Sequence, residues 1–474
     1  MKRREFLQVS LAAAVPAGLH CASEAEASSA RPQESEQETI IAGIRAALEK
    51  TLYPALRERA YPGHFTVVAD GKKYGAENTW PGLDSWEMAG AYLLVGKHRE
   101  VLDYFDFIQA AQRPDGNVPF AIFPADEPFK DLEHSALRGL RYPQDVYTYK
   151  PVARPGQPEY SNMNERKWIG LFTHWQMKAN PLSVLGPICF ILTGQEVFGA
   201  TKSDSWLAEK MPALEAAGRY LLTRISPNGL MGGAGFYIES PPRDQWDGIT
   251  QCYGICAFRR LASLSKLLGK RDAAATWNRH ADALQARFLE VFWQRDHFAE
   301  YVHPEHGLVD LHGLSDVNWA AIGLEVATDD HIKRLWPILM HEPMFWRGGM
   351  PTHLVTRPRT YQRWELSEPL PFEYDSWTND VAAMGRVWYL EVLACQRMHE
   401  YGRLRESVLK VCQRGEKDGE FWYERYYAGE GNTVRPGGAY GYCEYAAILV
   451  RAVLANPTVF PESMNFRTES KKAT

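Results

Sequence analysis

The stretch CYGICAFRRLASLSKLLGKRDAAATWNRHADALQARFLEVFW, residues 252–293, contains two helical patterns separated by a tight break. Apolar residues recur at three- and four-residue spacing on both sides of the segment LGKRD, residues 268–272. Gly269 is a helix-stop residue and Asp272 a helix-start residue. The first half is rich in apolar and small residues, and the second carries more charge. The stretch therefore predicts a helical hairpin with a buried first helix and an amphipathic second helix.

The same rhythm recurs along the whole chain, with tight turns alternating with long loops. Helical periodicity predicts helices at 36–58, 84–95, 98–112, 173–199, 205–224, 247–268, 271–294, 314–326, 329–340, 376–400, 402–414 and 440–454. Strand patterns are short, at 65–70, 236–240 and 297–302. Helices that follow long loops are the more apolar ones, such as AAILVRAVLA. We expect an all-α protein, an (α/α)6 toroid of six helical hairpins with a few short strands in its loops.

The first residues predict export rather than structure. Residues 1–27 have the order of an export signal: a charged start, a short apolar stretch and a small-residue end, with AEA at 25–27 as cleavage site. Arg3 and Arg4, followed by Glu5, Phe6 and Leu7, resemble a Tat signal. We expect a periplasmic or secreted protein with a single catalytic domain over residues 28–474. No other stretch is long and apolar enough for a membrane span, so the mature chain is expected off the membrane.

Composition narrows the function classes. A net charge of −5 argues against a nucleic-acid partner. The cysteines beyond the signal lack zinc spacings and mostly lie in apolar helical runs, which predicts free buried thiols. The sequence contains neither a His-Glu-x-x-His motif nor a phosphate loop, so we expect no catalytic metal and no cofactor, and a structural calcium ion stays open.

Six loops preceding predicted inner helices share one chemistry, an aromatic residue beside an acid, amide or histidine. They are TWPGLDSWE (79–87), ERKWIGLFTHWQ (165–176), PRDQWDG (242–248), GLSDVNW (313–319), FEYDSWTND (372–380) and FWYERYY (421–427). In a ring of hairpins these loops all lie at one end, which predicts an aromatic, acidic site. The alternative is that each acid only caps its helix.

Paired carboxyl groups at that end of the ring fit glycoside hydrolysis, which needs a protonated acid and an ionised base. Asp247, beside Trp246, fits the acid because an apolar wall raises the pKa of a carboxyl group. Glu424, on the last long loop, fits the base. Asp244 is the rival acid and Asp375 the rival base.

Four segments resemble the six-hairpin glycosidase superfamily. DQWDGITQCYGICAFRRLASLSKLLG is similar to the general-acid segment of glucoamylases, trehalases and processing α-glucosidases, which implies Asp247 as acid. WYERYYAGEGNTVRPGGAYGYCEYAAILVRAVLAN resembles their C-terminal segment, which implies Glu424 as base. TWPGLDSWE resembles their first hairpin, whose Trp and Asp hold the terminal sugar and match Trp80 and Asp84. The short single domain is nearest to mannosylglycerate-hydrolase-like members.

The resemblance departs from the superfamily at YDSWTNDVAAMGRVW. There Asp375 and Ser376 stand where those families have Arg-Gly, which leaves the substrate open. The expected carbohydrate-binding residues form one set: Trp80, Asp84, Tyr149, Trp168, His174, Gln176, Asp244, Trp246, Asp375 and Trp377.

Other chemistries on the same ring stay open. A polysaccharide lyase would need a Tyr or His base with Arg or Lys, which RPRTYQR at 357–363 offers. A sugar epimerase of the N-acylglucosamine type would use a histidine pair, for which His174 and His353 are candidates. A carbohydrate-binding protein without activity is a third alternative.

Overall fold

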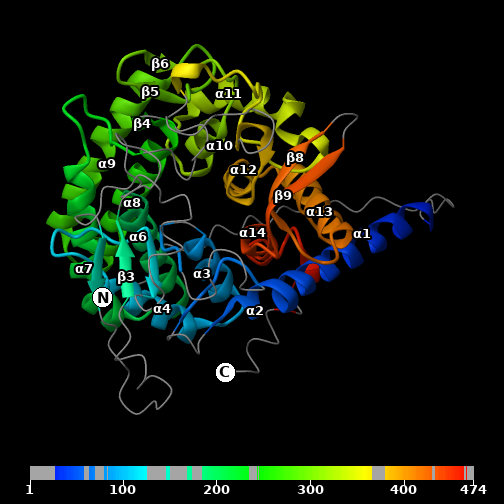
Figure 1. The fold of residues 1–474 in the computed structure, drawn as a ribbon, viewed down its shortest axis with the longest axis horizontal. Coiled ribbons are helices and arrows are strands. Elements are labelled where there is room, and N and C mark those ends of the chain that lie inside the picture. The colour runs from blue at the N-terminus through cyan, green and yellow to red at the C-terminus, as the bar shows by residue number, and fades with distance from the viewer. Residues whose placement is uncertain are drawn as a thin grey trace, which may run out of the picture.

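The computed structural model describes residues 27–57, 63–69, 79–82, 84–124, 146–149, 168–172, 184–233, 243, 245–365, 379–429, 433–463 and 466. Within them the chain alternates between two sets of helices (Figure 1). The inner set is α3 (Ser85–Leu94), α6 (Leu185–Thr201), α8 (Gly248–Leu267), α10 (Asp316–Gly323), α12 (Gly385–Met398) and α14 (Cys443–Leu454). The outer set is α1 (Ala27–Ala46), α4 (His98–Ala110), α7 (Asp204–Thr223), α9 (Arg271–Phe292), α11 (Asp329–His341) and α13 (Tyr401–Lys417).

The inner helices form a closed ring. Each one packs against the next in chain order, and α14 closes the circle against α3. The outer helices lie behind them, with α9 against α8, α7 against α6 and α13 against α12. This arrangement confirms the predicted (α/α)6 toroid.

Burial separates the two sets as the sequence predicts. Every residue of α14 is buried, so this helix is enclosed on all sides. In α9 the buried residues recur along a single stripe, Ala274, Trp277, Ala281, Leu284, Phe288 and Phe292. A helix that buries one stripe covers a core from outside, whereas a helix buried all round lies within it.

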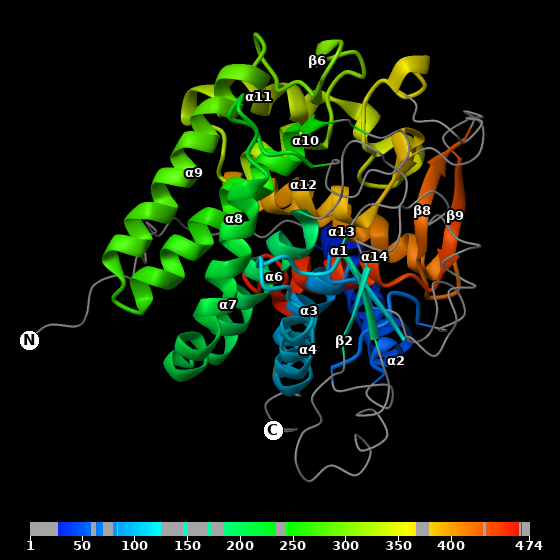
Figure 2. The ribbon, with the colours of Figure 1, turned by 60° about the vertical axis from the view of Figure 1, so that its left-hand side comes forward.

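Three small sheets lie in the long connections that lead into inner helices. Their antiparallel orders are β1-β3-β2, β4-β5-β6 and β7-β8-β9. The strands are β1 (Ala121–Pro124), β2 (Val146–Tyr149), β3 (Trp168–Leu171), β4 (Trp246–Asp247), β5 (Tyr301–His303), β6 (Gly307–Val309), β7 (Ala382–Ala383), β8 (Tyr423–Ala428) and β9 (Val434–Tyr440). Figure 2 shows β8 and β9 on one side of the ring, away from the turn between α8 and α9. We call the end of the ring that carries the inner-helix N-termini and these connections the N-terminal face.

Several predicted boundaries shift. The first predicted helix, 36–58, begins earlier, with α1 at Ala27, and continues through a π-helix, η1 (Ala47–Leu52), into α2 (Tyr53–Ala55). The helix predicted at 376–400 starts at Gly385, because residues 379–383 form a 3-10 turn, η7 (Asn379–Val381), and β7, which pairs with β8. The other 3-10 segments among the described residues are η5 (Pro343–Gly349), η6 (Arg363–Glu365) and η9 (Pro461–Ser463).

The described cysteines are all buried and unpaired: Cys189, Cys252, Cys256, Cys395, Cys412 and Cys443. This confirms the prediction of free thiols for these six. Of the helices in the described ranges, none has both the length and the apolar character needed to cross a bilayer.

Candidate active site at the N-terminal face

The first group of site residues lies where α3, α12 and α14 begin. The carboxyl group of Asp84 accepts hydrogen bonds from the guanidinium of Arg386 and from the hydroxyl of Tyr442. It makes no capping bond to α3, so the helix-capping alternative fails for this residue. Arg386 also holds Glu444, through its backbone N–H at 2.5 Å and its Nε at 2.8 Å. We call Asp84, Glu87, Arg386, Glu424, Tyr442 and Glu444 the Asp84 cluster.

Acids outnumber the single guanidinium in this cluster, and their pKa values reflect that. Burial raises the pKa of Glu444 to about 8, an effect that Arg386 only partly offsets. Burial also raises the pKa of Asp84 and, more strongly, that of Glu87. Neither carboxyl oxygen of Glu87 has a hydrogen-bond partner among the described residues. The charge of Glu424 adds to the raised pKa of both Asp84 and Glu444, so Glu424 lies close to them.

Glu424 is positioned by the β8–β9 ribbon. Its Oε2 accepts from the backbone N–H of Ala439 at 3.3 Å, and its Oε1 lies 3.0 Å from Nη2 of Arg425. Tyr423 pairs with Tyr440 and Arg425 with Gly437, so β9 carries one extra residue opposite Glu424. Gly438 adopts the left-handed region there, with φ of 76°, and a Cβ at this position would overlap the Glu424 side chain. A bulge of this kind re-aims the facing side chain, here a carboxyl group with donors on both oxygens.

Asp247 lies at the start of α8, on the opposite arc of the ring. Its Oδ1 accepts from the backbone N–H of Ile249 at 2.6 Å, so the capping role is confirmed here. Its Oδ2 lies 3.5 Å from Nη1 of Arg243. Burial raises the pKa of Asp247 to about 8, with Arg243 opposing and Asp316 adding to the rise. Inner helices all enter the ring from the same end, so Asp247 and Glu424 both lie at the N-terminal face.

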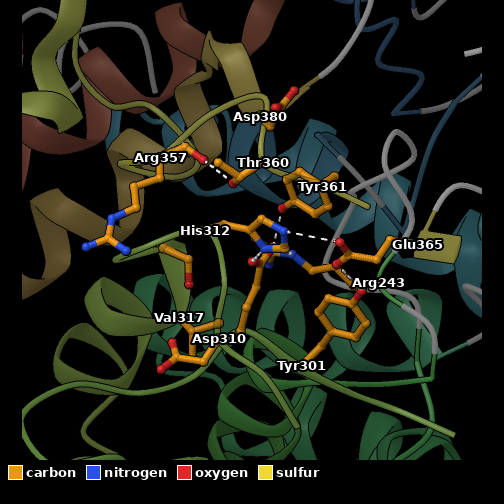
Figure 3. A network of polar contacts seen from close by, with 12 residues as sticks. Arg243, Tyr301, Asp310, His312, Val317, Arg357, Thr360, Tyr361, Glu365 and Asp380 are labelled. Carbon is orange, nitrogen blue, oxygen red and sulfur yellow. Dashed lines mark hydrogen bonds and ion pairs between the residues drawn. The ribbon is translucent and has the colours of Figure 1, made fainter. Parts of the chain in front are cut away.

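Arg243 anchors a second buried network, shown in Figure 3. Its Nη1 lies 2.8 Å from Oδ1 of Asp316, and its Nε donates to Oε1 of Glu300 at 2.6 Å. Glu300 also accepts hydrogen bonds from the Tyr361 hydroxyl and from Nδ1 of His312. We call Arg243, Asp247, Glu300, His312, Asp316, Tyr361 and Glu365 the Arg243 cluster.

The remaining contacts of this cluster tie the loop after residue 355 to the ring. The His312 ring stacks on Tyr361 with centroids 3.6 Å apart, and its Nε2 lies 3.4 Å from Glu365. Tyr301 donates to the other oxygen of Glu365 at 2.5 Å. Although burial opposes its charge, the Glu300 and Glu365 carboxylates raise the pKa of His312 to about 9. The pKa of Glu300 falls to about 2, because Arg243 and His312 outweigh burial.

The other predicted site residues divide into two groups. Trp80 and Trp246 are half-buried at the N-terminal face: Trp80 packs edge-on against Phe120, and Trp246 donates from Nε1 to Ser226 at 3.0 Å. Trp168 and Tyr149 pair with each other across β3 and β2. Asp244, His174, Gln176, Asp375 and Trp377 lie outside the described residues.

Tyr361 and His353, named above for the alternative chemistries, have unsuitable environments. Burial and Glu300 raise the pKa of Tyr361 far above its usual value, which disfavours the phenolate that a lyase base requires. Burial lowers the pKa of His353 to about 3, so this ring stays neutral and is a weak base. No group of three or more His, Cys, Asp or Glu within the described ranges is arranged to hold a metal ion.

Sequence reasoning missed most of each cluster. Asp316 stands in GLSDVNW, one of the six loops, but received no role. Arg386 and Glu444 fall in the first turns of two largely buried inner helices. Charged residues at the start of helices that are buried all round are the signal that would have found them, because burial of a charge requires a partner.

The sequence matches no protein-family model and no curated protein sequence. Solved structures do share the fold. An uncharacterized conserved protein from Thermus thermophilus superposes with a TM-score of 0.55 at 13% identity, over 84% of this chain and 98% of that chain. The GH63 mannosylglycerate hydrolase of the same organism, solved in complex with glucose, gives a TM-score of 0.53 at 13% identity, again over 84% of this chain and 98% of that chain.

A third similar structure comes from a longer protein. The GH78 family rhamnosidase of a Bacillus species gives a TM-score of 0.50 at 13% identity over 86% of this chain, which spans 34% of that chain. The chain thus has the (α/α)6 fold found in these two glycoside hydrolases.

Proposed function

We propose that this protein is a glycoside hydrolase that acts on an oligosaccharide or glycoside by an inverting, exo-acting mechanism. The observation that carries the proposal is the contrast between two buried carboxyl groups at the N-terminal face. Asp247 holds a proton at neutral pH, because burial raises its pKa to about 8. Glu424 accepts from the backbone N–H of Ala439 and lies against the guanidinium of Arg425, so donors face both of its carboxyl oxygens. The likeness in fold to two glycoside hydrolases supports the same reaction class.

In the proposed reaction Asp247 gives its proton to the glycosidic oxygen as the bond to the anomeric carbon breaks. Glu424 takes a proton from a water molecule, whose oxygen attacks the anomeric carbon from the other face. The sugar leaves with inverted configuration, and the two carboxyl groups exchange protons with solvent before the next turnover. Asp84 and Arg386 are placed beside Glu424 to hold sugar hydroxyl groups. The half-buried Trp80 and Trp246 are proposed as apolar walls for the sugar.

The remaining expectations are part of the same proposal. Trp168, His174, Gln176, Asp244, Asp375 and Trp377 are proposed carbohydrate contacts. Residues 1–27 are proposed as a Tat-like export signal, and the mature enzyme as periplasmic or secreted.

A substrate screen tests the proposal. The purified protein is incubated with a panel of aryl glycosides and oligosaccharides, and released sugar is measured. Asp247→Asn and Glu424→Gln should each lower kcat by about 10²- to 10⁴-fold on the best substrate. Glu290→Gln, on the exposed side of α9, is the matched control and should leave kcat unchanged. A product that absorbs in the near ultraviolet would indicate a lyase, and an isomerised sugar without cleavage would indicate an epimerase.

A further inference from the structure

One nitrogen of Arg243 is shared by two carboxyl groups from neighbouring inner helices. Nη1 lies 3.5 Å from Oδ2 of Asp247 at the start of α8 and 2.8 Å from Oδ1 of Asp316 at the start of α10. The two oxygens are therefore no more than about 6.3 Å apart, the sum of these separations. All three side chains are almost completely buried.

The arrangement leaves too little positive charge for the acids. Arg243 also donates to Glu300, so three carboxyl groups face one guanidinium. Glu300 has a second cation, His312, and a hydroxyl donor, Tyr361, and so stays ionised. Among the described residues, Asp247 and Asp316 share Nη1 of Arg243, and each accepts one backbone N–H, from Ile249 and Val317 respectively. Two like charges this close in a buried site cannot both persist, so one proton is retained between the two groups.

Of the two carboxyl groups, the one farther from Nη1 of Arg243 keeps the proton. Asp316 lies 0.7 Å nearer to Nη1 than Asp247 does, from 2.8 Å against 3.5 Å, so it takes the larger share of the positive charge. We propose that Asp316 is a positioning residue for Asp247: by occupying Nη1 of Arg243, it leaves the proton on Asp247, where the leaving group needs it. This inference rests on the proposed hydrolase function, and it extends that function to a residue that does not touch the substrate.

The charged groups around Asp247 set the expected pH behaviour. They are Arg243 before β4, Asp316 on α10 and Glu300 before β5. Cys252, one turn along α8, contributes no charge, because burial raises its thiol pKa. The negative charge of Asp316 adds to the raised pKa of Asp247, and the positive charge of Arg243 opposes it.

Asp316→Asn tests the inference, because asparagine keeps the size and the hydrogen bond to Val317 while removing the charge. The pKa of Asp247 should fall, so the basic limb of the kcat/KM profile should move to lower pH. At a pH on the alkaline side of this limb, lowering the pKa of Asp247 by one unit reduces its protonated fraction about tenfold. Asp316→Glu restores a negative charge and should return the limb toward its wild-type position. A uniform loss of rate without a shift of the limb would overturn the inference.

A second readout separates this inference from the proposed hydrolysis. Infrared difference spectra of wild type and Asp247→Asn, without substrate, should contain the carbonyl band of a protonated Asp247 at pH 7. In the Asp316→Asn background the same difference band should weaken at that pH. A band unchanged by Asp316→Asn would overturn the role of Asp316 even if the protein hydrolyses glycosides. A shifted band in a protein that cleaves no glycoside would uphold the pair and contradict the proposed function instead.

Discussion

Gly438→Ala is the substitution whose effect the structure defines most sharply. Its φ of 76° lies in the left-handed region, which costs a residue with a Cβ about 1–2 kcal/mol. The new Cβ would also lie 2.6 Å from Cβ of Glu424 and 3.0 Å from its carboxyl carbon, so the Glu424 side chain must move. A displacement of about 1 Å of a catalytic group can cost about 10²-fold in rate. We expect Gly438→Ala to lower kcat by about 100-fold.

Gly307→Ala is the matched control. Gly307, at the start of β6, has a φ of 73° but open space where its Cβ would stand. Both variants should lose about 1–2 kcal/mol of unfolding free energy in urea, and only Gly438→Ala should lose activity. Urea unfolding followed by fluorescence and initial rates on the best screened substrate provide the two measurements. Equal rates in the two variants would refute the reasoning that the bulge at Gly438 places a catalytic Glu424.

Two further predictions concern stability. The pKa of Glu300 is lowered by Arg243, His312 and Tyr361 together, and that of His312 is raised by Glu300 and Glu365, so this network stabilises the fold in a pH-dependent way. The pKa of Glu300 is lowered, so its contribution to the unfolding free energy is present above pH 4.5 and is lost as pH falls toward about 2. The pKa of His312 is raised, so its contribution is present below pH 6.5 and is lost as pH rises through about 9. Urea unfolding across pH should show this loss at alkaline pH in wild type, and an equally steep loss in His312→Gln would contradict it. Phe288→Ala in α9 should cost about 3–5 kcal/mol, since this ring is fully buried, whereas Leu267→Ala, 58% exposed, should change stability by less than about 0.5 kcal/mol.

The fold could be predicted from the sequence because the spacing of apolar residues within each segment predicts which helices are inner and which are outer. The alternation of enclosed and one-striped helices, exemplified by α14 and α9, follows from which residues are apolar and at what spacing. Boundaries were less predictable where tertiary pairing competes with helix propensity. Residues 379–383 continue a helical pattern, yet β7 pairs there with β8.

The site was predictable only in part, because sequence places acids on loops but does not pair them. The motif positions of Asp247 and Glu424 could be read from neighbouring aromatic residues. The environment of Asp247 depends on Asp316, which comes from another segment, and on Arg243, which stands in the same loop but whose partners the sequence does not reveal. That of Glu424 depends on Ala439 in the facing strand. The same limit explains why helix capping could not be decided for each acid: Asp247 caps α8, whereas Asp84 binds Arg386 instead.

The most direct test of the central claim is the configuration of the first sugar released. Proton NMR spectra are recorded during the first minutes of cleavage of the best substrate, before mutarotation mixes the anomers. With Asp247 as acid and Glu424 as base, the anomeric proton signal of the product should be that of the configuration opposite to the substrate. A product that keeps the configuration of the substrate would contradict the account, because Glu424 would then have to act as a nucleophile.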